Sequence, residues 1–199
     1  MGELHMKYRT GLIGTGPRHR TAERGGGYAV ARDHANSWAK INNAELVAVC
    51  DINRENLNAF AEDYSLKRTY ADYRDMLKDA GLDIVDICTW PPLHCEMVVA
   101  AAESGVKAIY CEKPMCLSLA EAETMINTCR KHGVKLAVSH QRRFEPMYQQ
   151  LRQRISAGAV GKVLEIQTRI CGEDADLLSW GTHWFDMMNF FLGDIPVRS

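Results

Sequence analysis

The chain has 199 residues, of which 46% are hydrophobic and 25% are charged, and its formal net charge is −1. This is the usual mix of a soluble globular protein with enough chain to bury a core. The near-balance of charge argues against nucleic acid or an anionic membrane as a partner. No apolar run approaches the roughly 20 residues that a membrane helix needs, so we expect no membrane partner.

The seven cysteines are scattered along the chain without a C-x-x-C pair. We therefore expect neither a disulfide framework nor a metal site. Several cysteines stand in apolar strand patterns and are expected to be small core residues. The N-terminal residues lack the apolar stretch of a signal peptide. Together these features predict a reducing, cytoplasmic compartment.

Predicted strands and helices alternate from about residue 8 to residue 140. Short apolar runs, several of them β-branched, predict strands at 8–14, 45–51, 83–89, 108–113 and 136–140. The segments between them predict helices at 28–41, 53–64, 73–80, 94–104 and 119–132. Gly133 is the expected C-cap of the last helix. This alternation predicts the α/β class, with a Rossmann-type doubly wound parallel sheet and helices on both faces.

A glycine turn follows the first predicted strand. Its sequence resembles the dinucleotide fingerprint G-x-G-x-x-G, with His19 in the third glycine's place. Gly14 permits a tight turn, and Gly16 lets the backbone approach a pyrophosphate at a helix N-terminus. Pro17 and Arg18 complete this candidate phosphate site. The alternatives are a glycine turn without a ligand and an arginine that is simply solvated.

Asp51 ends the second predicted strand, where an acid accepts hydrogen bonds from the adenosine ribose hydroxyls. A carboxylate there disfavours a 2′-phosphate, so we expect NAD. NADP stays the alternative because Arg54 would pair with a 2′-phosphate. Asp51 lies 35 residues after Gly16, where about 20 is usual, so the glycine-rich segment 24–27 is expected to be an insertion. Otherwise, Asp51 caps the helix that begins near Arg54.

Two later strands end in residues suited to the nicotinamide half of the cofactor. Thr89 ends one strand, and Pro92 belongs to a predicted rigid loop before His94, which opens the next helix. Glu112 and Lys113 end the following strand. Open α/β sheets bind ligands at this edge. A lysine partly withdrawn from water there is suited to general acid–base work, the alternative being a solvated lysine after a strand.

The pattern changes after residue 141. We expect a helix at 143–157, a strand of alternating apolar and polar residues at 162–170, and an apolar helix at 181–192. His183 and Asp186 are three residues apart and share a face of the last helix. A functional role and a core role for His183 both stay open.

Taken together, these residues resemble the Gfo/Idh/MocA oxidoreductases, which include glucose–fructose oxidoreductase and inositol 2-dehydrogenase. The matching pieces are Gly14-x-Gly16, Asp51, Pro91-Pro92-x-His94, Glu112-Lys113-Pro114 and Gly181-x-His183-x-x-Asp186. The resemblance implies an NAD(P)-binding Rossmann domain at 7–141. It also implies the first part of a substrate and oligomerisation domain, with a mostly antiparallel sheet, at 142–199. A sugar or polyol substrate and a homo-oligomer are implied as well.

The resemblance also assigns chemistry. Lys113 matches the lysine near the nicotinamide and the reacting oxygen, and His183 matches the acid/base histidine. Such side chains handle the hydroxyl proton while the cofactor takes the hydride. Ser179 departs from the pattern, because many polyol-oxidising relatives have an aspartate four residues before the histidine. Relatives are also considerably longer, so we expect a truncated or naturally short form.

Three functions are compatible with these residues. The first is an NAD(P)-dependent oxidoreductase acting on the CH–OH groups of a sugar or polyol. The second is redox-assisted glycoside cleavage, in which NAD is reduced and reoxidised within one turnover. The third is a nucleotide-sensing module with weak or no catalysis, which Ser179 and the short second domain favour.

Overall fold

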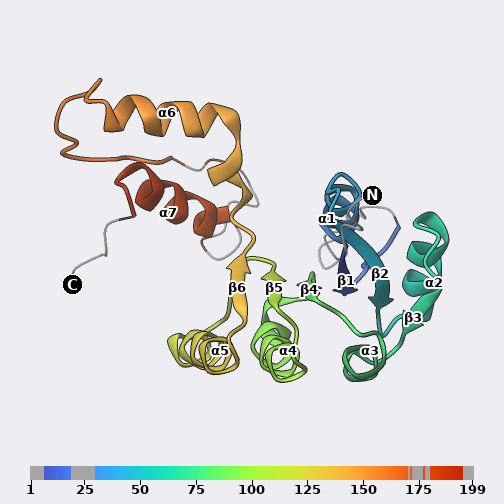
Figure 1. Cartoon of the computed structure of the whole chain (residues 1–199). Coiled ribbons are helices and arrows are strands. Elements are labelled where there is room, and N and C mark those ends of the chain that lie inside the picture. The colour runs from blue at the N-terminus through green and yellow to red at the C-terminus, as the bar shows by residue number, and fades with distance from the viewer. Residues whose placement is uncertain (1–6, 19–29, 170, 172–176, 178–179, 195–199) are drawn as a thin grey trace, which may run out of the picture. The chain divides into compact units, whose positions relative to one another are not determined.

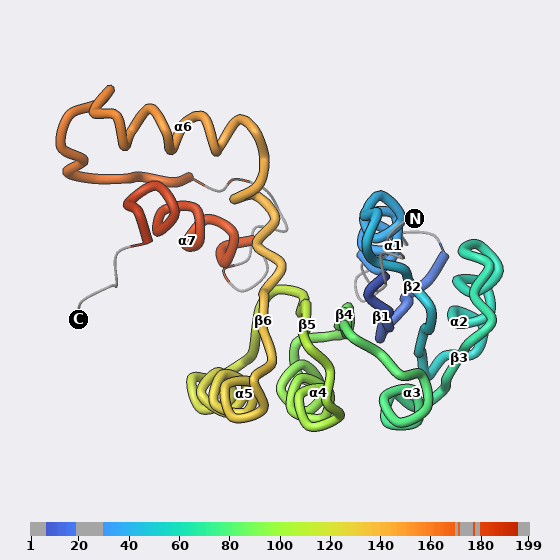
Figure 2. The backbone as a smooth tube through the Cα atoms, viewed as in Figure 1, coloured from blue at the N-terminus to red at the C-terminus, as the bar shows by residue number. Residues whose placement is uncertain are grey.

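The computed structural model describes residues 7–18, 30–169, 171, 177 and 180–194. The chain divides into two compact units, Met1–Val138 and Ser139–Ser199. The first unit carries the sheet, and the described part of the second unit is built from helical segments. Figures 1 and 2 follow these elements along the chain.

The sheet has six parallel strands in the order β3-β2-β1-β4-β5-β6. The strands are β1 (Tyr8–Ile13), β2 (Ala44–Cys50), β3 (Arg68–Tyr70), β4 (Ile84–Ile87), β5 (Ala108–Cys111) and β6 (Lys135–Val138). The doubly wound parallel sheet predicted from the sequence is confirmed. The strand order reverses between β1 and β4, and open sheets bind ligands at such a switch point. Strand β3 was not predicted, because three residues are too few to show a period.

Five helices cover the two faces of the sheet. They are α1 (Val30–Trp38), α2 (Arg54–Asp63), α3 (Tyr73–Asp79), α4 (Pro91–Glu103) and α5 (Leu119–His132). Alternate strand residues point to opposite faces. Leu12 and Val49 therefore pack with α1 and α2, whereas Ile13 and Cys50 pack with α3, α4 and α5. Figure 1 shows α3, α4 and α5 along one side of the sheet.

Helix α4 begins earlier than the sequence predicted. Pro91 and Pro92 are its first residues, after Trp90 as N-cap. Proline suits these positions because the first helical N–H groups need no partner within the helix and φ is already near the helical value. The predicted rigid proline loop is therefore wrong, and His94 lies inside the first turn of the helix instead of opening it.

The second unit contains η1 (Gln141–Phe144), α6 (Pro146–Ser156) and α7 (Trp180–Phe191). The helix expected at 143–157 is confirmed over 146–156, but it begins three residues late, because Pro146 starts the α-helix and a 3₁₀ turn precedes it. The strand expected at 162–170 is wrong for its described part, 162–169, which forms no strand. A strand needs the backbone of a neighbour, and no described residue pairs with this segment.

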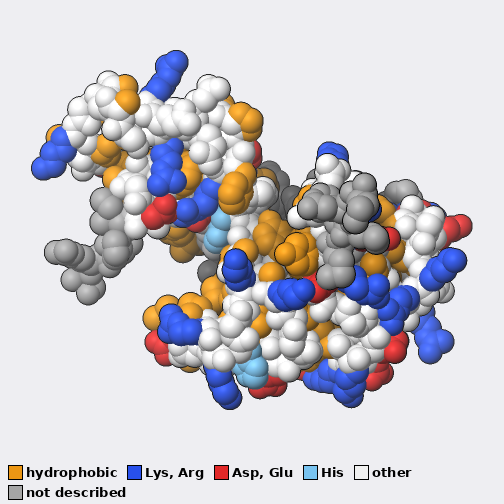
Figure 3. Space-filling model, in the orientation of Figure 1, with side chains coloured by type: hydrophobic (Ala, Val, Ile, Leu, Met, Phe, Trp, Pro, Cys, Tyr) orange, Lys and Arg blue, Asp and Glu red, His pale blue; other side chains and the backbone are white. Residues whose placement is uncertain are grey.

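None of the helices in the described ranges is long and apolar enough to cross a membrane. Basic and acidic side chains both occur over the face drawn in Figure 3. This mixture agrees with the net charge of −1.

Candidate functional site

The glycine turn lies at the switch point between β1 and β4. Gly14 and Gly16 both have positive φ, +88° and +62°, a region that glycine enters without steric cost. A Cβ on Gly14 would lie 2.8 Å from Thr89 Cγ2 and 3.1 Å from the Thr89 amide nitrogen. The turn after β1 therefore rests directly against the loop after β4. Pro17 follows the turn and is half-buried.

Asp51 joins the end of β2 to this turn. Its Oδ2 accepts hydrogen bonds from Thr15 N at 2.8 Å, Thr15 Oγ1 at 2.7 Å and Gly16 N at 3.2 Å. The helix cap is a different residue, because Asn53 accepts from the first N–H groups of α2. The alternative role of Asp51 as N-cap is therefore wrong. Its carboxylate instead fixes the glycine turn at the edge where a dinucleotide is expected.

The two described basic residues predicted to contact phosphate are Arg18 and Arg54. Arg18 pairs with Asp63 and, at 3.4 Å, with Glu62 of α2. The hydrogen bond to Asp63 is the main reason that the pKa of Arg18 is raised. Arg54 is exposed at the start of α2. His19 lies outside the described residues. The structure thus gives Arg18 partners on α2, and a phosphate contact for it stays a prediction.

Ala31 is a residue that the sequence analysis missed. It is 1% exposed at the start of α1 and packs in the core with Leu12 and Val49. The third glycine of the fingerprint normally allows this close approach of helix and sheet. Asp51 lies 20 residues after Ala31, which is the usual spacing to the acid. Once 24–27 was taken as an insertion, counting back 20 residues from Asp51 would have pointed to Ala31 in the place of the third glycine.

The ends of β4 and β5 are tied together by His94. Its ring is fully buried, with Nδ1 3.0 Å from the Pro114 carbonyl oxygen and Nε2 3.0 Å from the Thr89 carbonyl oxygen. Any effect of His94 on a cofactor would therefore act through these two loops. Pro92 is exposed, whereas Thr89 and Lys113 are half-buried.

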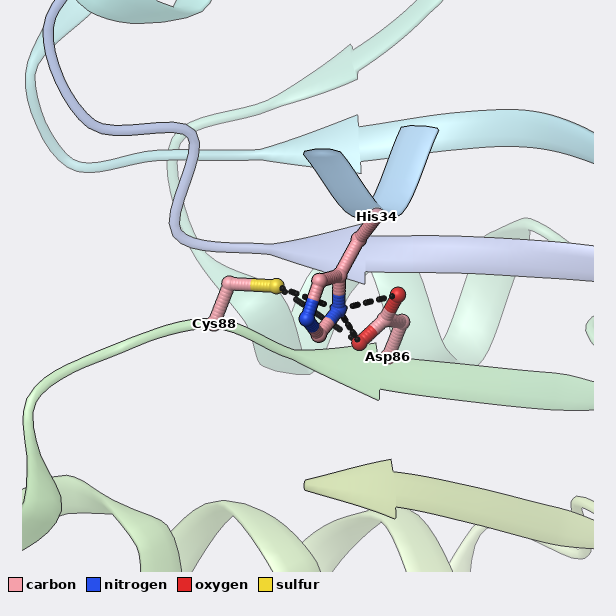
Figure 4. A group of neighbouring side chains, drawn as sticks. All are labelled: His34, Asp86 and Cys88. Atoms are coloured by element: carbon pink, nitrogen blue, oxygen red, sulfur yellow. Dashed lines mark hydrogen bonds and ion pairs between the residues drawn. The ribbon is translucent and has the colours of Figure 1, made fainter. Parts of the chain in front are cut away.

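A buried polar cluster lies behind this edge and was not predicted. His34 of α1 has Nδ1 2.9 Å from Asp86 Oδ1 and Nε2 3.0 Å from Glu112 Oε1. Trp38 Nε1 donates to Asp86 Oδ2 at 2.6 Å. Figure 4 shows the His34 ring between Asp86 and Cys88. A fully buried aspartate is rarely found without such partners, so Asp86 inside an apolar strand was the signal in the sequence.

The two carboxylates of this cluster favour a positive charge on its histidine. Burial is the largest influence on its pKa and opposes protonation, but the bonds and charges of Asp86 and Glu112 together raise the pKa of His34 to about 10. Burial also raises the pKa of Cys88 well above its usual value, so its thiol stays protonated. The donor atoms of His34, Asp86 and Cys88 lie within 4.8 Å of one another, as in a metal site. Both ring nitrogens of His34 already lie within hydrogen-bond distance of carboxylate oxygens, so we interpret the cluster as a hydrogen-bonded network.

His183 lies in the second unit, on α7, and is 4% exposed. Its ring meets that of His140 edge-on, with centroids 6.0 Å apart. Asp186 accepts from Arg143 Nε at 2.6 and 2.7 Å and lies 3.8 Å from His140 Nδ1. Two imidazoles, a carboxylate and a guanidinium therefore gather in this unit. Ser179 lies outside the described residues.

Comparison with known proteins supplies the family. The GFO_IDH_MocA model, described as an oxidoreductase family with an NAD-binding Rossmann fold, matches residues 21–140. D-apiose dehydrogenase from Paraburkholderia graminis is 34% identical over 83% of this chain and 48% of its own length. Myo-inositol 2-dehydrogenase from Thermotoga maritima is 30% identical over 81% of this chain and 51% of its own length. The chain thus spans about half the length of these curated relatives.

A solved structure gives the same answer for the fold. An oxidoreductase from Agrobacterium radiobacter, in complex with NAD+, L-tartaric acid and magnesium, superposes with a TM-score of 0.79 at 25% identity. The superposition covers 94% of this chain and 55% of that one. The family match extends over more than half of the chain and includes Asp51, His94, Glu112 and Lys113. The chain therefore belongs to the Gfo/Idh/MocA oxidoreductase family, whose N-terminal unit is an NAD-binding Rossmann fold.

Proposed function

We propose that this chain binds NAD at the β1/β4 switch point and serves hydride transfer between the nicotinamide and a hydroxyl or carbonyl carbon of a sugar or polyol. The observation that carries the proposal is the junction of the glycine turn, Asp51 and the loop after β4 at the carboxyl edge of the sheet. The dehydrogenase names of the relatives support the substrate class.

The residues at this edge fit a dinucleotide. Gly14 and Gly16 both have positive φ, and we expect a turn of this kind without side chains to let the backbone approach a pyrophosphate. Asp51 stands where its carboxylate would accept hydrogen bonds from the adenosine ribose hydroxyls in place of the bond from the Thr15 hydroxyl. Its negative charge would repel a 2′-phosphate, which favours NAD over NADP. Thr89 and Lys113, on the neighbouring strand ends, would border the nicotinamide.

The side chains supply orientation and proton transfer. Bound NAD provides the centre that accepts or gives the hydride. Lys113 follows β5, and its own backbone N–H donates to Oε2 of Glu112 at 3.0 Å. We assign to its ammonium group the binding of the substrate oxygen. We assign to His183 the acceptance or return of the hydroxyl proton, and this role stays a prediction.

Cofactor binding is tested by energy transfer from the four tryptophans to NADH. We expect saturable transfer with NADH and weaker transfer with NADPH. Asp51→Asn should raise the Kd for NADH about tenfold and should bring it closer to the Kd for NADPH. Asp75→Asn, which changes an exposed carboxylate on α3, should leave both Kd values unchanged. No transfer with either nucleotide at millimolar concentration would refute the proposal.

Turnover is tested with a panel of polyols and aldoses in the presence of NAD. Net NADH formation supports the dehydrogenase. Cleavage of a glycoside without net NADH would support redox-assisted cleavage, and tight binding with neither signal would support a sensor. The cytoplasmic location and the homo-oligomer expected from the sequence stay predictions.

A further inference from the structure

One carboxylate connects the candidate catalytic lysine to the first helix. Glu112 is 7% exposed, and its Oε2 accepts the Lys113 backbone N–H at 3.0 Å. The other oxygen, Oε1, lies 3.0 Å from Nε2 of His34. The position of the Lys113 backbone is therefore coupled to a side chain that stands 78 residues earlier in the sequence than Glu112.

The same histidine is anchored at its other nitrogen. Nδ1 donates to both oxygens of Asp86, at 2.9 and 3.0 Å, and Asp86 belongs to β4 beside β1. His34 itself stands in the second turn of α1, next to the core residue Ala35. One ring thus joins α1, strand β4 and the loop after β5. These elements carry the phosphate side and the nicotinamide side of the proposed cofactor site.

We propose that His34 is a positioning residue that holds the Glu112–Lys113 segment in a fixed place relative to α1 and β4. The inference rests on the proposed function, because it gives this segment its role at the nicotinamide. His34 touches neither the nucleotide nor the substrate in this account. It acts through Glu112. Residues that do not touch a ligand often orient, by hydrogen bonds, the residues that do.

The charges around the ring explain why a histidine is needed. Asp86 and Glu112 face it from β4 and from the loop after β5, Cys88 Sγ lies 3.3 Å from Nδ1, and the Tyr110 ring is 5.2 Å away. A ring that donates from both nitrogens must be protonated. A neutral ring would donate to only one of the two carboxylates. The other would keep its second donor, which is Trp38 Nε1 for Asp86 and the Lys113 N–H for Glu112, but the loss of a charged partner is costly in a buried site. The raised pKa of His34 agrees with the protonated form.

The test compares two ligands of the full chain. ADP-ribose carries the adenosine and pyrophosphate parts, and NADH adds the nicotinamide. In His34→Gln, one amide cannot bridge both carboxylates, so we expect the Kd for NADH to rise about tenfold while that for ADP-ribose stays within about twofold. His132→Gln, at the exposed end of α5, is the control and should change neither. An equal loss for both ligands, or no loss for either, would overturn the proposal.

A second readout needs no ligand. Hydrogen exchange of the Lys113 amide, bonded to Glu112, should accelerate at least tenfold in His34→Gln beyond any change of core amides such as Val85. If the native chain binds neither ligand, the proposed function fails, and this exchange rate alone decides the positioning role. If His34→Gln does not fold, Glu112→Gln takes its place. That variant keeps the pair of His34 and Asp86, and the same ligand pattern is expected.

Discussion

The absence of a side chain at Gly14 lets the turn after β1 lie directly against the loop after β4. The φ of Gly14 is +88°, and a Cβ there would meet Thr89 Cγ2 and the backbone of Cys88 and Thr89 at 2.8 to 3.1 Å. We predict that Gly14→Ala lowers the free energy of unfolding by roughly 1–3 kcal/mol and weakens NADH binding. Gly105→Ala is the matched control. Gly105 has φ +89° but nothing within 4 Å of its would-be Cβ.

The comparison of these two glycines in urea unfolding separates backbone strain from steric contact. The control carries only the cost of a positive φ, about 1 kcal/mol, and should bind NADH normally. If Gly105→Ala destabilises as much as Gly14→Ala, the close approach to Thr89 contributes nothing to stability.

The protonation of His34 predicts a pH dependence of stability. Its pKa in the folded chain is about 10, against an ordinary value of 6.5. Because the folded value is the higher one, the stabilisation is complete below about pH 6.5 and is lost as the pH rises to about 10. In this window the free energy of unfolding should fall with a slope of at most about 1.4 kcal/mol per pH unit from this group.

The measurement is urea unfolding between pH 6.5 and 10 for the native chain and His34→Gln. Subtracting one curve of the free energy of unfolding against pH from the other cancels the contributions of the lysines, tyrosines and cysteines that both chains share. The difference should shrink steadily toward pH 10. A difference that is constant over the window would show that His34 is neutral in the fold.

Helix α5 shows which element boundaries a sequence fixes. Ser118 and Glu121 form a reciprocal capping box, and Gly133 closes the helix at φ +70°, so both ends carry local signals and the prediction of 119–132 was confirmed. The paired prolines before His94 carried an ambiguous signal, since proline suits both a loop and a first helical turn. The strand at 162–170 was predicted from alternation alone, which says nothing of a partner strand.

The capping box gives a prediction at the scale of the element. Ser118→Ala removes the hydroxyl that accepts the Glu121 N–H, and we expect a loss of about 1 kcal/mol in the free energy of unfolding. Glu123→Ala changes an exposed position within the same helix and should stay within a few tenths of a kcal/mol. Equal effects of the two variants in chemical unfolding would contradict this role of the cap.

At the scale of the whole molecule, alternation of short apolar strands and helices was enough to predict the parallel sheet. The place of Asp51 and Lys113 directly after strands was predictable for the same reason, and their roles at a cofactor stay predictions. The cluster of His34, Asp86 and Glu112 was not, because its members are 52 and 78 residues apart and meet only in the folded sheet. Ala31 lies in the close helix–sheet contact that the third glycine of the fingerprint normally allows, whereas His19 lies outside the described residues.

The central claim is that the edge at the β1/β4 switch point is the NAD site. Titration of the isotope-labelled chain with NAD, followed by amide NMR, tests it most directly. We predict saturable shifts that concentrate on Gly14, Thr15, Gly16, Asp51 and Lys113. Saturable shifts that avoid these amides, or none at millimolar NAD, would contradict the account.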